Sequence, residues 1–202
     1  MTVYHREQTD KERALSKRGK RSKAKGKRGE KWLADFLREQ FGDLLGPGKL
    51  EVTQRNQGKW SGRYRPEVAI NPWGNYHDHL IHFECKRDEK RSILAAYKQA
   101  ERDCAPGAIP IAVCKRSREP AIAVFSNRTV DLSGLPRLEP HWHLESGKRL
   151  RSALLRATQI KDDDEIPVGE ISRYPKADVY AMWLEDYMPY LRSLLTEFLA
   201  GI

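Results

Sequence analysis

The stretch Leu80-Ile81-His82-Phe83-Glu84-Cys85-Lys86 decides the predicted fold, because it has the alternating pattern of a β-strand. Successive side chains on a strand point to opposite faces of the sheet. One face then carries only apolar side chains, from Ile81, Phe83 and Cys85, and suits packing against a helix. The other face presents the carboxylate of Glu84 beside the amine of Lys86. A carboxylate can bind a hard cation such as Mg²⁺, and an amine can orient an attacking water and stabilise charge on phosphate.

Outside this strand, hydrophobic periodicity and turn residues predict the remaining elements of one domain. Helices are expected from about Glu30 to Phe41, ending at Gly42, and at Ser92–Cys104. Strands are expected at Leu50–Asn56, Glu67–Ile70, Ile109–Lys115 and Ala121–Phe125, the last two being neighbours in the sheet. This order predicts an α/β domain over residues 30–126, with a mixed central sheet flanked by helices.

Residues 127–202 are expected to form a C-terminal helical extension. A helical stripe over Lys176–Leu199 consists of Tyr180, Trp183, Tyr187, Leu191, Leu194 and Phe198. Pro189 is expected to kink or divide this helix. The stripe can cover the open face of its own sheet or form a dimer interface, and we favour the first interpretation.

The net charge of +9 is concentrated at the N-terminus, since residues 1–29 hold eleven Lys/Arg and only three Asp/Glu. Such a block of like charge predicts a flexible arm that binds nucleic acid through counterion release. A solvated tail that only aids solubility is the alternative. The expected DNA contacts of the arm are Lys20, Arg21, Lys23, Lys25, Lys27 and Arg28.

The composition excludes a membrane protein and a disulfide-stabilised secreted protein. No stretch approaches the roughly 20 apolar residues of a membrane helix, and no secretory signal is found at the N-terminus. The cysteines, Cys85, Cys104 and Cys114, are odd in number and are expected to be free thiols in a reducing cytoplasm.

Two further carboxylates are candidate partners of Glu84. Glu30 lies within the otherwise apolar helical stripe of Leu33, Ala34, Leu37 and Phe41, where a carboxylate is costly unless something binds it. An acid that pairs with the helix dipole is an equally good interpretation of Glu30. Glu67 begins a strand joined by a hairpin to the strand of Glu84, so one cation could bridge the two. An exposed edge-strand acid is the alternative for Glu67.

Four segments in order resemble the PD-(D/E)XK nuclease superfamily, most closely phage and archaeal Holliday junction resolvases and related small phage endonucleases. These segments are Lys27-Arg28-Gly29-Glu30, Arg65-Pro66-Glu67-Val68, His82-Phe83-Glu84-Cys85-Lys86 and Tyr97-Lys98-Gln99-Ala100, within residues 26–126. The resemblance implies a restriction-endonuclease-like core. It also implies that Mg²⁺ or Mn²⁺ is bound by Glu30, Glu67, Glu84 and the backbone carbonyl of Cys85. Lys86 would serve the attacking water, and Gln99 would lie near the site.

Glu67 departs from the family, which usually has aspartate at this position. Asp78, in the hairpin turn, is an alternative ligand, and a histidine-rich metal site there fits no common zinc spacing. The loop before Pro66 is expected to grip DNA through Lys59, Trp60, Ser61, Arg63 and Arg65, and Ser61 matches a serine of resolvases. Trp60 could stack on exposed bases or simply pack the loop onto the core.

The resulting expectation is a metal-dependent DNA endonuclease, structure-specific for branched DNA and acting as a homodimer, because a four-way junction needs two symmetric cuts. A flap, single-strand or nicking nuclease of the same fold is one alternative. A DNA-binding protein that keeps the fold without catalysis is another. The resemblance implies a phage origin and the cytoplasm of a bacterial or infected host cell.

Overall fold

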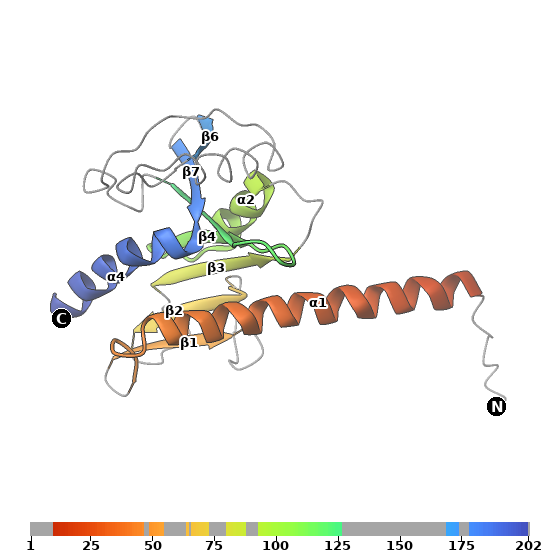
Figure 1. Ribbon diagram of the computed structural model, residues 1–202, viewed down its shortest axis with the longest axis horizontal. Helices are drawn as coiled ribbons and strands as arrows, with labels where there is room; N and C mark the ends of the chain where they lie inside the picture. Colours follow the sequence, from red (N-terminus) through yellow and green to blue (C-terminus); the bar gives the residue numbers. More distant parts are fainter. Residues whose placement is uncertain are drawn as a thin grey trace.

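The computed structural model describes residues 10–46, 49–54, 64, 66–72, 80–87, 93–126, 169–173 and 178–201. Within these ranges the chain is an α/β protein with three helices and seven strands (Figure 1). The helices are α1 (Asp10–Gln40), α2 (Ile93–Asp103) and α4 (Leu184–Ala200). The expected class, a mixed sheet flanked by helices with a C-terminal helix packed on it, is confirmed.

The strands form one sheet in the order β1-β2-β3-β4-β5-β7-β6. Their bounds are Leu50–Gln54 for β1, Val68–Pro72 for β2, Ile81–Lys86 for β3, Ile109–Cys114 for β4, Ile122–Ser126 for β5, Gly169–Arg173 for β6 and Asp178–Trp183 for β7. Only β3 and β4 pair in parallel; every other neighbouring pair is antiparallel. A parallel pair needs a crossover connection, and α2 lies in the connection between β3 and β4. The predicted adjacency of β4 and β5 is confirmed.

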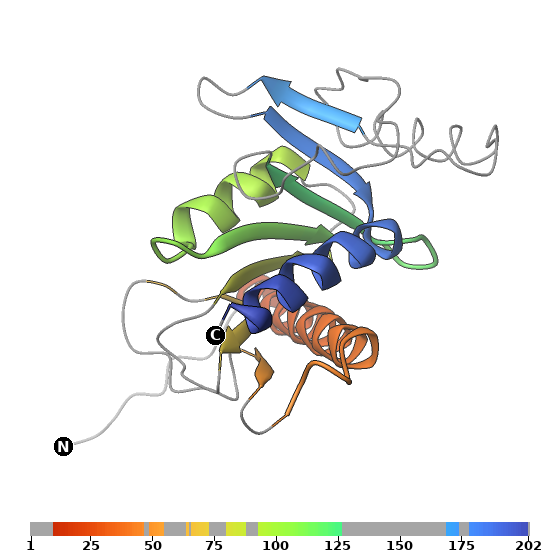
Figure 2. The ribbon, with the colours of Figure 1, turned by 90° about the vertical axis from the view of Figure 1, so that its left-hand side faces the viewer.

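The helices cover the two faces of the sheet with separate apolar clusters. On one face, α1 contributes Leu33 and Leu37, and α4 contributes Tyr187, Leu191 and Leu195, to a cluster that contains Phe83 and Cys85. Phe41, directly after α1, belongs to the same cluster. On the other face, α2 packs Ile93, Ala96, Tyr97 and Ala100 against Ala112, Ile122 and Val124. Figure 2 shows α1 and α4 apart from α2 around the sheet. The predicted apolar face of β3 is therefore the face that α1 covers.

The predicted start of the first helix at about Glu30 is wrong, because α1 already begins at Asp10. The basic segment is rich in Lys and Arg, which are good helix formers. Its C-terminal continuation is held on the sheet by Leu33 and Leu37, and extending an existing helix adds one hydrogen bond per residue fixed. The segment was predicted to be flexible from its block of charge and its lack of apolar periodicity. Like charges three or four residues apart do disfavour a helix, so the anchored continuation of α1 outweighs that cost.

The predicted C-terminal helix is wrong in its first part, because Asp178–Trp183 forms strand β7. Phe125 of β5 pairs with Tyr180 of β7, and their rings stack with centroids 6.3 Å apart. Tyr180 and Trp183 fit a helical stripe by spacing, but aromatic residues are equally suited to strands. The helix from Leu184 is not divided, since α4 continues through Pro189.

Helix α4 is also fastened to the end of α1 by Arg192. Its guanidinium donates hydrogen bonds of 2.7 and 3.0 Å to the carboxylate of Asp43. It also donates to the carbonyl of Gln40, one of the last carbonyls of α1, and lies over the ring of Phe41. Helix α4 of the C-terminal extension thus packs on the sheet within one chain, as the favoured interpretation expects.

All three cysteines are free, as predicted, and Cys85 is buried. No helix in the described part of the chain is both long and apolar enough to cross a membrane.

Candidate functional site

The register of β2 and β3 brings Glu67 next to Glu84. Val68 pairs with Phe83, and the N–H of Glu67 donates a 3.1 Å hydrogen bond to the carbonyl of Phe83. Because side chains alternate along a strand, Glu67 and Glu84 share the face that Val68 and Phe83 do not use. Glu84 pairs with Ala112, which belongs to the cluster under α2. The two carboxylates therefore lie on the α2 side of the sheet, at the carboxyl end of β3.

The ammonium of Lys86 joins both carboxylates. Its Nζ forms an ion pair and hydrogen bond with Oε1 of Glu84 and lies 3.7 Å from Oε1 of Glu67. Lys86 stands two residues after Glu84, so the two side chains leave β3 on the same face. The predicted side-by-side carboxylate and amine are thus found in contact, with a second carboxylate alongside.

The second oxygen of Glu67 is held by the backbone of β3. The N–H of Cys85 donates a 2.7 Å hydrogen bond to Oε2 of Glu67. Glu67 is consequently fixed at both carboxylate oxygens, one by a backbone amide and one by an ammonium. The long glutamate side chain makes this reach possible from the residue that precedes β2.

This cluster carries more negative than positive charge in a poorly solvated place. The side chain of Glu84 is 2% exposed, and those of Glu67 and Lys86 are both 13% exposed. Two carboxylates and one ammonium leave a net charge of about −1 within the cluster, which a further cation would offset. The partial exposure of Glu67 and Lys86 leaves the cluster open to solvent.

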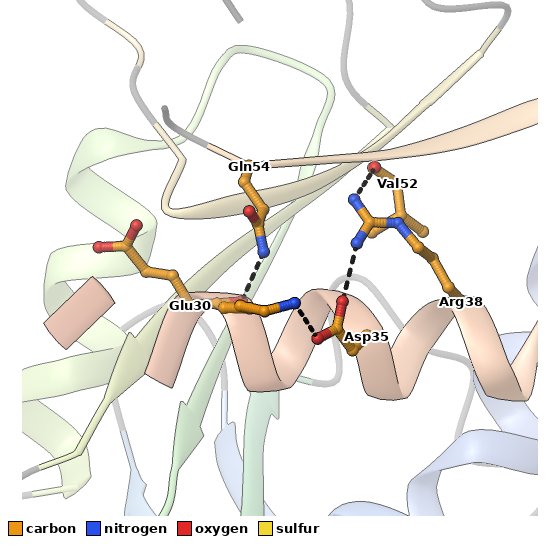
Figure 3. Close-up of polar contacts among 6 residues, drawn as sticks. Glu30, Asp35, Arg38, Val52 and Gln54 are labelled. Carbon is orange, nitrogen blue, oxygen red and sulfur yellow. Dashed lines mark hydrogen bonds and ion pairs between the residues drawn. The ribbon is translucent and has the colours of Figure 1, made fainter. Parts of the chain in front are cut away.

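Glu30 approaches the same strand from its other face. The preceding residue, Gly29, packs so closely that a Cβ there would lie 3.3 Å from Sγ of Cys85 and 3.5 Å from Cβ of Arg87. Glu30 is 8% exposed, and Gln54 of β1 donates a 3.4 Å hydrogen bond to its backbone carbonyl. Figure 3 shows the Glu30 carboxylate pointing away from the neighbouring contacts of Asp35 and Arg38. Helix α1 therefore crosses β3 at its carboxyl end, beside the Glu67–Glu84 pair.

The carboxylates around Cys85 affect the pKa of its thiol. Burial raises the pKa of this thiol most strongly, and the negative charges of Glu67 and Glu30 raise it further, whereas Lys86 lowers it. Glu30 and Glu67 are thus both close enough to act on one buried sulfur through space.

A metal ion at this site would need several oxygen donors. Among the described residues, no three His, Cys, Asp or Glu side chains form a group that could hold a metal, so Glu30 does not join Glu67 and Glu84 in one. Mg²⁺ is nevertheless commonly bound by one or two carboxylates, several waters and the phosphates of its substrate. Glu67 and Glu84 fit that requirement, with the ammonium of Lys86 now standing between them.

The α2 side of the site contains two more polar residues. Gln99 lies half-buried on α2, the helix that covers the face of Glu84. His82, two residues before Glu84 on the same face, is fully buried. A role of His82 in contacting a substrate is excluded, because no part of its surface is open to solvent.

Four basic residues at this edge of the sheet were missed by the sequence analysis. Arg87 directly follows β3, and Lys115, Arg116 and Arg118 follow β4. The strands run in parallel and the N–H of Lys115 donates to the carbonyl of Lys86, so both sets leave the sheet at one edge. Nε of Arg87 is buried without a hydrogen-bond partner. The signal was present in the sequence, since basic residues directly follow two predicted strands.

Several predicted residues lie outside the described part of the chain. They are the loop residues Lys59, Trp60, Ser61, Arg63 and Arg65, and the alternative ligand Asp78 with its neighbours His77 and His79. The basic residues of the predicted arm lie on α1. The side chains of Lys20, Arg21, Lys23, Lys27 and Arg28 are exposed, and that of Lys25 is half-buried.

No protein-family model, curated protein or solved structure matches this chain.

Proposed function

We propose that this chain is a metal-dependent nuclease of the PD-(D/E)XK type that hydrolyses phosphodiester bonds in DNA. The observation that carries the proposal is the meeting of Glu67, Glu84 and Lys86 at the carboxyl end of β3. Two carboxylates and one amine at a solvent-accessible strand end are the groups that this chemistry requires. The topology, with the acids on an antiparallel pair followed by a parallel crossover, is consistent with a restriction-endonuclease-like core.

In this proposal Glu67 and Glu84 hold one Mg²⁺ or Mn²⁺, with the carbonyl of Cys85 as a further donor, and Glu30 is not one of the ligands. The bound ion supplies polarisation of a phosphate oxygen and a lowered pKa for a coordinated water. Lys86 turns from its carboxylate partners towards the phosphate, where its charge stabilises the developing negative charge. Gln99 of α2 and Arg87 at the end of β3 are the candidates for orienting the substrate.

Branched DNA and a two-fold dimer remain part of the proposal through the resemblance to resolvases. Basic residues at the carboxyl edge of the sheet and along α1 would contact the phosphates of branched or unbranched DNA. A nuclease for flaps, single strands or nicks would use the same catalytic groups. The shape of the DNA substrate is therefore tested separately from the metal-dependent hydrolysis.

The test is cleavage by the full chain of a synthetic four-way junction, a flap, a linear duplex and a single strand. Each is incubated with Mg²⁺, Mn²⁺ or EDTA. We expect cutting that depends on the metal and is lost in Glu84→Ala, by about 100-fold or more. Symmetric junction cuts would support the resolvase, and cutting of the other substrates alone would support the second nuclease. Glu101→Ala, which removes an exposed acid of α2, is the matched control and should cut normally.

If the wild-type chain binds these substrates but cuts none in any metal, the protein is a DNA-binding protein without catalysis. If Glu84→Ala still cuts at the wild-type rate, the site is elsewhere in the chain.

A further inference from the structure

The part of α1 that precedes the sheet is a dense run of cations. Residues 16–28 contain eight basic residues and no acid, namely Lys17, Arg18, Lys20, Arg21, Lys23, Lys25, Lys27 and Arg28. Figure 1 shows this part of the helix projecting beyond the strands while the rest of α1 lies along the sheet. At about 1.5 Å per residue, residues 16–28 form a rod roughly 20 Å long. A charged segment of this kind attracts polyanions through counterion release.

One face of the rod is rich in small residues. Ser16, Gly19, Ser22, Gly26 and Gly29 recur every three or four positions, which places them on one side of a helix. Gly29, the last of them, is explained by its close approach to Cys85. A Cβ at Gly19 or Gly26 would meet nothing within 4 Å. Each glycine costs a helix about 1 kcal/mol relative to alanine, and the described part of the protein does not require either of these two.

We propose that this rod binds double-stranded DNA, with the small-residue face against the duplex and the flanking lysines on its phosphates. The inference rests on the proposed function and specifies where and in which form the substrate lies. By helical position, Lys20, Lys23 and Lys27 flank the small-residue face on one side and Lys25 flanks it on the other. A helix seated in a groove has a phosphate backbone on each side, so it needs cations on both flanks.

The composition of the rod favours duplex DNA over other polyanions. Residues 16–28 contain no aromatic side chain, so they offer no platform on which the bases of a single strand could stack. The major groove of B-DNA admits an α-helix, whereas the major groove of an RNA duplex is too narrow for side chains to read. Pairing of the small-residue faces of two copies would bring two such runs of cations together, and like charges repel.

The small-residue face leads to the carboxyl end of β3, on the α1 side of the sheet, opposite Glu67 and Glu84. Gly26 is followed on the same face by Gly29 and Glu30, where α1 reaches Cys85 and Arg87 at the end of β3. A duplex on this face would lie in the corner between the rod and the carboxyl edge of the sheet, which bears Lys115 and Arg116. At 3.4 Å per base pair, a rod of about 20 Å spans roughly six base pairs to one side of the site.

The experiment compares Gly26→Leu with Ala24→Leu in the full-length chain. Both variants place the same side chain on the rod without changing its charge, but Gly26 lies on the small-residue face and the exposed Ala24 lies on the other side. Affinity for a linear DNA duplex is measured by fluorescence anisotropy in EDTA, so that no cutting occurs. We expect Gly26→Leu to weaken binding about tenfold or more and Ala24→Leu to change it less than about twofold.

Circular dichroism checks that both variants keep α1, which leucine favours over glycine. Equal binding by the two variants, whether both strong or both weak, would overturn the contact face. Tighter binding of a single DNA strand or an RNA duplex than of the DNA duplex would overturn the partner.

The binding measurements, on the two variants and on the different nucleic acids, are made without metal. They are therefore independent of catalysis. Loss of cutting in Glu84→Ala tests the nuclease proposal alone. A chain that binds duplex DNA through Gly26 and never cuts would retain this inference and lose that function.

Discussion

The backbone N–H of Cys85 donates a 2.7 Å hydrogen bond to Oε2 of Glu67. The strand that carries Glu84 and Lys86 thereby holds the carboxylate that comes from the start of β2. If the proposed function holds, this bond accounts for a glutamate at a position where PD-(D/E)XK nucleases usually have aspartate. The extra methylene lets the carboxylate span from one strand to the backbone of the next.

Glu67→Asp is therefore expected to be a poor replacement here. The shorter side chain cannot reach both the Cys85 amide and Lys86, so the variant should lose about 1 kcal/mol of unfolding free energy and cut more slowly. Glu67→Gln keeps an oxygen that can accept from Cys85 but loses the charge. It should fold more stably than Glu67→Asp while cutting no faster than background. Denaturant unfolding and cleavage assays measure the two effects, and full activity in Glu67→Asp would show that the reach is not needed.

Lys86→Met should destabilise the protein in a way that a metal ion reverses. Without the ammonium, Glu67 and Glu84 place two charges together in a poorly solvated site, at a cost of about 3 kcal/mol. Because Mg²⁺ can replace the missing positive charge, it should raise the melting temperature of Lys86→Met more than that of the wild type. The triple variant with Glu67→Gln and Glu84→Gln is the control and should show no such rise. Equal shifts in all three proteins would exclude these carboxylates as metal ligands.

Replacing Lys20, Lys23 and Lys27 with glutamine should reduce the salt dependence of DNA binding. Removing one lysine–phosphate ion pair lowers the slope of log affinity against log salt by about 0.9, so the slope should fall by nearly three times that amount. Lys31→Gln is the control, because Lys31 lies on the same helix but is already paired with Asp35 at 2.8 Å. An unchanged slope in the triple variant would mean that α1 does not contact the phosphates.

Asp43→Asn should lower stability at neutral pH but not in acid. The hydrogen bond from Arg192 holds the pKa of Asp43 below its ordinary value, and burial opposes this only in part. A carboxyl whose pKa is lowered by folding stabilises the folded state above its unfolded pKa, and this contribution disappears as the pH falls through the folded value. The melting temperatures of wild type and variant should therefore differ at pH 7 and converge below about pH 4. A difference that persists in acid would point to packing rather than charge.

The helical conformation of the basic segment could not be predicted from its sequence. Lysine-rich segments with glycines lack the apolar stripe from which helices are predicted, and Gly19, Gly26 and Gly29 lower the helix propensity further. Helix α1 forms because Leu33 and Leu37 anchor its other half on the sheet, together with Phe41 just beyond its end. Likewise, Tyr180 and Trp183 were assigned to a helix by spacing, and only pairing with β5 makes them part of a strand.

The sequence by itself determined the mixed α/β class, the apolar face of β3 and the pairing of an acid with an amine two residues later. These follow from local periodicity, because side-chain alternation and helical spacing do not depend on distant contacts. The sequence also identified Glu67 as a neighbour of Glu84, because a hairpin leaves few ways to pair two strands.

Only the tertiary structure decided which side of the sheet each acid occupies. It places Glu67 and Glu84 with Lys86 on the α2 side and brings Glu30 to β3 from the α1 side. It also gathers Arg87 and Lys115 at one edge through the parallel pairing of β3 and β4. The order of the layers and strands arises because elements far apart in the chain bury apolar surface against each other. No local sequence pattern therefore predicts that order.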